Sequence, residues 1–149
     1  MTLATAELED LTLTVTEEIR IDAPLEGSFA ALLEQMGPHN ETPDGTAMPM
    51  TLEARPGGRW FRDLGGDNGH HWGHVQAIKR PALLEITGPL FMSHPVVSNV
   101  QYRLTAVEGG TLLTLRHSAF GLISNDHRRG VTAGWRHMLA AVKNLAESA

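Results

Sequence analysis

The sequence contains no cysteine, which excludes disulfide bonds and thiolate ligands to a metal. Lysine is also scarce: two lysines and ten arginines stand against 17 acidic residues, giving a formal net charge of −5. Binding to nucleic-acid phosphates needs clustered Lys and Arg, so no nucleic-acid partner is expected. No apolar run is long enough to cross a membrane, and the N-terminus lacks the regions of a signal peptide. These absences predict a soluble cytoplasmic protein with no membrane contact.

The length and composition of the chain predict one domain. A chain of 149 residues with 42% apolar content is long enough to bury a core of its own. Residues 1–10 are small and acidic, and they are predicted to form an N-terminal tail. The predicted domain spans residues 11–149.

Two helices are predicted from the spacing of apolar residues. Asp22 is the expected N-cap of the first helix, with Pro24 in its first turn and Gly37 at its end. The second helix is capped by Ser124 or Asn125 and runs to the C-terminus. Its apolar stripe, which needs a broad partner surface, consists of Val131, Trp135, Met138, Leu139, Val142 and Leu145.

Segment 37–50 separates the first helix from the strands that follow it. It contains three prolines and two glycines, and it shows no periodicity, so a loop is predicted. Loops of this length are often lids or binding loops, and Met48 and Met50 would suit an adaptable apolar lid. A mobile surface loop is the alternative.

Alternating apolar residues predict strands along most of the remaining chain. The first of these strands, residues 11–22, is either regular or interrupted by a β-bulge near Glu17. This order of elements predicts an α+β fold, in which a curved antiparallel sheet of six to seven strands wraps around the long C-terminal helix. The predicted strands are 11–22, 51–55, 59–64, 70–78, 83–87, 96–107 and 111–118.

Five motifs, in this order, resemble those of a known superfamily. They are IRIDAPLEGSFAAL, PGGRW, GHVQAIKRPALLEIT, SNVQYRL with GGTLLTLRHSAFG, and GWRHMLAAVKNL. The chain resembles the helix-grip (SRPBCC) superfamily of START and Bet v 1 type domains. Within it, the chain is similar to bacterial proteins related to the C-terminal domain of the activator of Hsp90 ATPase. The resemblance implies a helix-grip fold with a cavity between sheet and helix for an apolar or aromatic small molecule.

The chain departs from the resemblance in two places. Segment 37–50 stands where family members commonly carry a second short helix with an aromatic pair. The separate N-terminal domain with which eukaryotic cochaperones stimulate Hsp90 is not expected here. Cochaperone activity is therefore not implied.

The densest group of histidines is His70, His71 and His74. On a regular strand, His70 and His74 share one face about 13 Å apart and His71 points to the other, so no metal site is expected. If Val75 faces the core, His71 lines the cavity. A register slip by one residue would place Trp72 and His74 there instead. No cofactor is predicted.

Several other side chains are candidates for ligand contact, and each has a structural alternative. His117 either anchors a ligand or bonds to backbone, and Tyr102 either reaches a ligand or fills the core. An inward Arg62 would pair with a bound carboxylate or phenolate, or with an internal acid. Phe91, Met92 and Phe120 are expected at the cavity mouth, where they would cover either a ligand or a partner subunit. The predicted ligand-binding residues are Trp60, Arg62, His71, Tyr102, His117 and Trp135.

Three functional hypotheses follow. The leading one is a binding protein that holds a small hydrophobic molecule for stress-related sequestration or sensing. The second is a small cyclase, dehydratase or hydrolase acting on an aromatic or polyketide-like substrate, with paired His and Tyr side chains in the cavity and no catalytic residue assigned. The third is an interaction module that docks a partner, or a second copy in a homodimer, through a sheet edge or an exposed Trp72. If His71 or His117 donates to a bound anion, affinity rises as pH falls through about 6.5.

Overall fold

One antiparallel sheet and two α-helices make up the computed structural model, which describes residues 7–149. The strands are β1 (Thr12–Ile21), β2 (Thr51–Leu52), β3 (Arg59–Gly65), β4 (Asn68–Lys79), β5 (Leu83–Gly88), β6 (Val96–Val107) and β7 (Gly110–Gly121). The helices are α1 (Leu25–Met36) and α2 (Asn125–Glu147), with a 3-10 turn at Leu8–Asp10. None of the helices described in residues 7–149 is long and apolar enough to cross a membrane.

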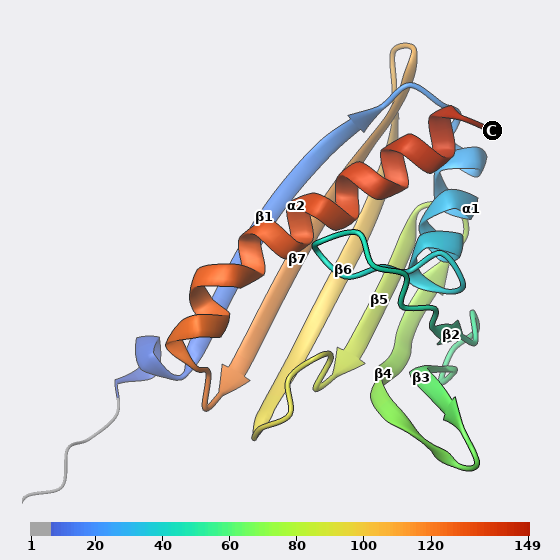
Figure 1. Cartoon of the computed structure of the whole chain (residues 1–149). Coiled ribbons are helices and arrows are strands. Elements are labelled where there is room, and N and C mark those ends of the chain that lie inside the picture. The colour runs from blue at the N-terminus through green and yellow to red at the C-terminus, as the bar shows by residue number, and fades with distance from the viewer. Residues whose placement is uncertain (1–6) are drawn as a thin grey trace, which may run out of the picture.

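The strands lie in the order β1-β7-β6-β5-β4-β3-β2 across the sheet. Figure 1 shows the sheet curving around α2, which crosses its concave side. This confirms the predicted α+β helix-grip architecture. The alternative of a bulge near Glu17 is wrong, because β1 pairs with β7 without interruption from Thr12 to Ile21.

The N-terminus of α1 lies later than the sequence predicts. Asp22 is not its N-cap: Pro24, in an extended conformation, precedes the first helical residue, Leu25. The junction between β1 and α1 is held instead from β7, where the buried hydroxyl of Thr111 donates to the carbonyl of Ala23 at 2.9 Å. Asp22 contributes its backbone to a different contact, with the end of α2.

The start and the apolar face of α2 agree with the sequence prediction. The Ser124 side chain accepts a hydrogen bond from the backbone N–H of His127, which is the geometry of an N-cap. A fully buried aliphatic or aromatic side chain contributes about 1.5–3 kcal/mol from the hydrophobic effect, so this face is a main source of stability. Its buried side chains are Val131, Trp135, Leu139, Val142 and Ala146.

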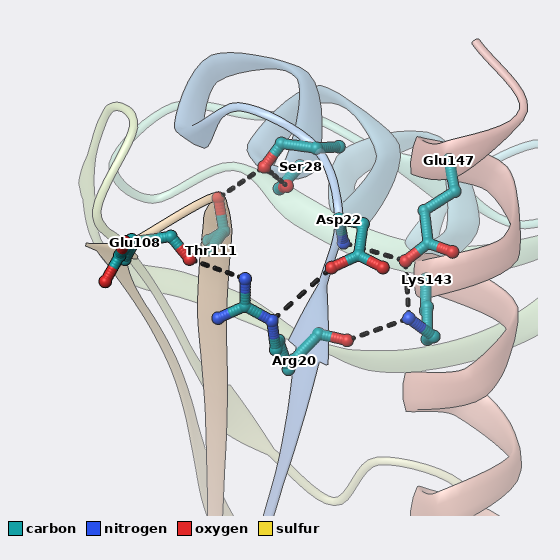
Figure 2. A network of polar contacts seen from close by, with 8 residues as sticks. Arg20, Asp22, Ser28, Glu108, Thr111, Lys143 and Glu147 are labelled. Atoms are coloured by element: carbon teal, nitrogen blue, oxygen red, sulfur yellow. Dashed lines mark hydrogen bonds and ion pairs between the residues drawn. The ribbon is translucent and has the colours of Figure 1, made fainter.

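A polar network, which we call the clasp, fixes the C-terminal end of α2 to β1 (Figure 2). The carboxylate of Glu147 accepts hydrogen bonds from the Lys143 ammonium group and, at 2.8 Å, from the backbone N–H of Asp22. Lys143 also donates to the carbonyl of Arg20 at 3.0 Å, and the Arg20 guanidinium lies 3.4 Å from the Asp22 carboxylate. The Lys143 hydrogen bond lowers the pKa of Glu147. The clasp therefore joins two segments at opposite ends of the sequence.

Segment 37–50, which we call the lid, is folded on itself. Its two arms meet at an isolated bridge between Glu41 and Ala47, and the backbone N–H of Thr42 donates to the carbonyl of Thr46 at 2.8 Å. The buried Asn40 side chain donates to the carbonyl of Met48 at 3.1 Å. These bonds give the loop a hairpin-like shape, and in Figure 1 it runs alongside the middle of α2.

The predicted N-terminal tail, residues 1–10, lies partly outside the described residues. Within the described part, the 3-10 turn Leu8–Asp10 precedes β1. The guanidinium of Arg128, from the first turns of α2, donates to the carbonyl oxygens of Asp10 and Thr12 at 2.7 and 2.8 Å. This contact holds the start of β1 beside the start of α2.

Candidate ligand cavity

A cavity of about 360 Å³ lies between the lid, the N-terminal half of α2 and the paired strands β3 and β4. Its volume falls at the lower end of the range of about 300–1,000 Å³ that ligand pockets occupy. The lid forms one side with residues that include Asn40, Glu41 and Met48, and α2 forms another with Val131, Trp135 and Met138. The space is suited to a small, mainly apolar molecule.

Four aromatic side chains form a continuous part of the cavity wall. They include all three tryptophans of the chain, Trp60, Trp72 and Trp135, together with Phe91. The Trp60 and Trp72 rings meet edge to face with centroids 5.0 Å apart, and Phe91 lies 5.7 Å from Trp72 and 6.0 Å from Trp135. Such edge-to-face pairs stabilise one another beyond their buried area. The wall is therefore a preformed aromatic surface.

The polar atoms of the three indoles are already used inside the protein. Each indole N–H donates to an internal acceptor, so the tryptophans offer a ligand their carbon surfaces and no free hydrogen-bond donor. The donor to acceptor distances are 2.7 Å from Trp60 to the carbonyl of Met36, 3.0 Å from Trp72 to His70, and 2.9 Å from Trp135 to His117.

His117 lies behind the wall and supports Trp135. Because an indole N–H can only donate, Nδ1 of His117 must accept, and its proton is on Nε2, which donates to the hydroxyl of Ser98 at 2.9 Å. Burial, and to a smaller extent the nearby His127, lower the pKa of His117 to about 4. Protein groups therefore occupy both ring nitrogens of His117. This agrees with a structural role instead of ligand contact, but the partners are the side chains of Trp135 and Ser98 and not the backbone.

Tyr102 is also placed behind the wall. Its side chain is completely buried, its hydroxyl lies 3.2 Å from the sulfur of Met36, and its ring meets Trp135 edge to face at 6.3 Å. Burial raises the pKa of the Tyr102 hydroxyl. Of the six predicted site residues, the structure brings only Trp60 and Trp135 to the cavity surface.

A β-bulge decides which residues of β4 face the cavity. Trp60 of β3 pairs with Gly73, and the next residue, Phe61, pairs with His71, so Trp72 is an extra residue in β4. In a bulge, two successive side-chain positions lie on nearly the same side of the sheet. Trp72 and Gly73 are both buried, whereas His71 is exposed. The structure therefore places His71 outside the cavity and Trp72 in its wall.

Neither register predicted for this strand is right, because both assume strict alternation. The structure buries Trp72 and Val75 together and leaves His71 and His74 exposed, with ring centroids 4.6 Å apart. Gly73 makes the bulge sterically feasible: a Cβ there would lie 2.8 Å from the carbonyl oxygen of Thr87. Because Trp72 is buried, it cannot serve as the exposed docking residue that the interaction-module hypothesis proposed.

Arg62 and His71 line a separate hollow on the outer surface of the β3–β4 hairpin, which they share with Asp63 and Asp67. Partial burial and the nearby His74 lower the pKa of His71. Within residues 7–149, no group of three or more His, Asp or Glu side chains is arranged to hold a metal ion. This hollow is not connected to the aromatic wall by any shared lining residue.

Three titratable residues of the cavity wall were not predicted as site residues. Glu41 of the lid and His137 of α2 form a pair at 2.8 Å, each side chain about one-third exposed. His127 stacks on Phe91 with centroids 4.9 Å apart, and burial followed by the proximity of His94 lowers the pKa of His127. The Nε2 atoms of His94 and His127 are buried without a hydrogen-bond partner among residues 7–149. Because His127 lies one helical turn before Val131, helical spacing could have placed it on the same face of α2.

Two glycines of α2 leave space where the helix lines the cavity. A Cβ at Gly130 would meet no atom within 4 Å, and one at Gly134 would meet only Pro43 of the lid, at 3.9 Å. Glycine inside a helix is less stable than alanine by about 0.5–1 kcal/mol. The helix is therefore weaker at these two positions of the cavity wall.

Comparisons with known proteins agree with this architecture. A family model described as "Activator of Hsp90 ATPase homolog 1-like protein" matches residues 22–147. No curated protein sequence matches the chain.

Solved structures with the same fold share little sequence with the chain. A protein from Rhizobium leguminosarum is 20% identical with a TM-score of 0.71, covering 93% of this chain and 96% of that one. Ara h 8.0201 is 14% identical with a TM-score of 0.67, covering 93% and 99%. The di-domain ARO/CYC StfQ from the steffimycin biosynthetic pathway is 14% identical with a TM-score of 0.68, covering 95% of this chain and 52% of StfQ. At these identities the likeness concerns the fold alone.

Proposed function

Because the chain belongs to the family of activator of Hsp90 ATPase homolog 1-like proteins, within the superfamily of START and Bet v 1 type domains, we propose that it binds a small aromatic molecule in the cavity between the lid and α2. The observation that carries this proposal is the aromatic wall. Trp60, Trp72, Phe91 and Trp135 surround one cavity, and their ring surfaces are its main chemical feature.

The polar chemistry of the wall supports binding by shape and ring contact. The indole N–H groups have internal acceptors, and His117 holds Trp135 from behind. A fixed wall loses little conformational entropy when a ligand binds, which favours affinity. The two glycines of α2 support the same proposal, because a helix selected only for stability would carry alanine there.

We further propose that the protein uses this binding for sequestration or sensing of its ligand under stress, in the cytoplasm. A homodimer remains a prediction. Native mass spectrometry of freshly purified protein tests both points, because it reports the mass of a retained small molecule and the number of chains. A retained aromatic compound would identify the ligand class directly.

Isothermal titration calorimetry with naphthylmethanol tests the binding proposal. We expect a Kd of about 10–100 µM for a naphthalene-sized neutral ligand. In Gly134→Leu, the new side chain extends from α2 toward the lid, where the glycine Cβ position already lies 3.9 Å from Pro43. We expect this variant to bind at least about tenfold more weakly.

Ala133→Leu is the matched control, because residue 133 is the neighbouring α2 position and is exposed. It adds the same leucine side chain outside the cavity, and we expect unchanged affinity. Urea denaturation of all three proteins separates blocked binding from lost folding. Absence of binding in the wild-type protein, or equal affinity in Gly134→Leu, would contradict the proposed site.

One observation favours a second candidate function, the small enzyme. Glu41 and His137 are titratable, lie 2.8 Å apart and line the same cavity, which is the minimum arrangement for proton transfer to a bound substrate. Hydrolysis of a naphthyl acetate ester tests this alternative. Enzymatic activity would require turnover above the buffer rate and its loss in His137→Gln, with naphthylmethanol affinity retained.

A further inference from the structure

Among residues 7–149, no lysine or arginine lines the cavity wall. The cationic side chains of α2 are bound elsewhere, each to an oxygen atom outside the wall. The partners are the Asp10 and Thr12 carbonyls for Arg128, Asp126 for Arg129, Glu17 for Arg136, and Glu147 with the Arg20 carbonyl for Lys143. An anionic ligand would therefore find no permanent positive charge in the cavity.

The histidines near the cavity do not supply that charge either. His127 lines the wall, but burial and the neighbouring His94 lower its pKa and favour the neutral ring. His117 is neutral and lies behind Trp135 with both nitrogens bonded. His137 is charged only when protonated, and it then forms an ion pair with the Glu41 carboxylate, so the pair has no net positive charge.

The remaining charges of the wall are negative or partly negative. Aromatic ring faces carry negative electrostatic potential and attract cations, most strongly in tryptophan. The Glu41 carboxylate, with 31% of its side chain exposed, is the wall's one acidic group among the described residues. Burying a ligand carboxylate here would cost its hydration, and no permanent cation among the described wall residues would compensate for that cost. A protonated amine would instead meet ring faces and Glu41.

We propose that the cavity selects its ligand by charge: it rejects anions and binds most tightly an aromatic molecule that carries a protonated amine placed beside Glu41. This rests on the proposed function, because only a cavity that binds aromatic molecules can discriminate among them. It also replaces the sequence expectation of a bound carboxylate or phenolate. That expectation relied on Arg62, and the pH dependence expected for a bound anion relied on His71 or His117. None of these three residues lines the cavity.

Three probes with the same ring system test the proposal by calorimetry at neutral pH and constant ionic strength. They are naphthylmethylamine, which is cationic, naphthylmethanol, which is neutral, and naphthoate, which is anionic. We expect the amine to bind about five- to tenfold more tightly than the alcohol, and naphthoate at least about tenfold more weakly than the alcohol.

Glu41→Gln assigns the preference to one side chain. The glutamine carbonyl can still accept a hydrogen bond from His137, so the contact between lid and α2 is retained. We expect this variant to lose the advantage of the amine over naphthylmethanol, so that the ratio of the two affinities falls to about one. Glu18→Gln, at an exposed position of β1, is the control with the same change in net charge. His137→Gln removes the competing partner of Glu41 and should strengthen amine binding.

The outcomes separate this proposal from the proposed function. If naphthylmethanol binds but naphthoate binds as tightly as the amine, or if Glu41→Gln leaves their ratio unchanged, charge selection is wrong and the binding function stands. If none of the three probes binds, both proposals fail.

Discussion

The two halves of α2 face different surroundings. In the C-terminal half, Leu139, Val142 and Ala146 are 2%, 0% and 5% exposed, and the clasp ties the last turn to β1. Figure 1 shows α1 lying beside this end of the helix. In the N-terminal half, Gly130 and Gly134 leave an open space under the lid. One helix thus provides close packing at one end and a cavity at the other.

This difference indicates how the fold accommodates a cavity. An internal space removes van der Waals contacts, and two helical glycines lower the stability of the same segment. Tight packing and polar contacts at the other end of the helix can offset those losses. We therefore expect substitutions of packed residues in the C-terminal half to change stability, and substitutions that fill the cavity in the N-terminal half, such as Gly134→Leu, to change binding.

The largest expected effect comes from a pair of neighbouring residues. Leu139→Ala removes a side chain from the packed core, and it should lower the free energy of unfolding by about 3 kcal/mol. Met138→Ala shortens a partly buried side chain that already borders the cavity, and it should cost less than about 1.5 kcal/mol. Urea denaturation measures both. Equal losses would contradict the difference in packing between the core and the cavity wall.

The contribution of His117, which supports Trp135 from behind the aromatic wall, to the stability of the protein depends on pH. The folded-state pKa of His117 is about 4, below the ordinary value of about 6.5, so its contribution to stability is present above pH 6.5 and is lost as pH falls toward 4. Over that window, the free energy of unfolding should fall by up to about 1.4 kcal/mol per pH unit from this group. Urea denaturation of the wild type and His117→Gln between pH 7 and pH 4.5 isolates it. Parallel curves for the two proteins would show that His117 does not titrate this way.

A smaller effect of opposite sign is expected in the N-terminal half. Gly130→Ala adds a methyl group where no atom lies within 4 Å, so it should stabilise the protein. The expected gain is about 0.5–1 kcal/mol from helix propensity. Thermal or urea denaturation measures the gain, and Ala133→Gly, at an exposed α2 position, should give a loss of similar size. A destabilised Gly130→Ala protein would mean that this position is not open.

The smallest effect is expected at the clasp and should remain local. Glu147→Ala removes the acceptor of the Asp22 backbone N–H and the partner of Lys143 (Figure 2). Hydrogen exchange at Asp22 should become faster, while the affinity for naphthylmethanol stays unchanged. A change in affinity would show that the two halves of α2 are energetically coupled.

The sequence predicted the repetitive parts of this fold well. Alternation placed Leu113, Leu115 and His117 on the interior side of β7, and all three are buried. Helical spacing identified the face of α2, which includes Trp135. Both predictions rest on a regular period, and the structure keeps that period over the whole length of β7 and α2.

The candidate site depends on features without a period, and there the sequence was less informative. The bulge at Trp72 exchanges the expected positions of His71 and Trp72, although the Trp72-Gly73 dipeptide, with no room for a Cβ at Gly73, is a local signal for it. The pairing of Glu41 with His137 follows from the internal hydrogen bonds of the lid. No pattern in a loop predicts such a contact with a distant helix.

The most direct test of the account is amide and indole NMR of nitrogen-labelled protein during titration with naphthylmethanol. The three indole N–H groups all belong to tryptophans of the wall, so each is a reporter placed at the cavity. We predict shifts in these three signals, in the lid and in the N-terminal half of α2, and none at the clasp. Shifts confined to the outer hairpin around Arg62 and His71, or spread over the C-terminal half of α2, would contradict the proposed site.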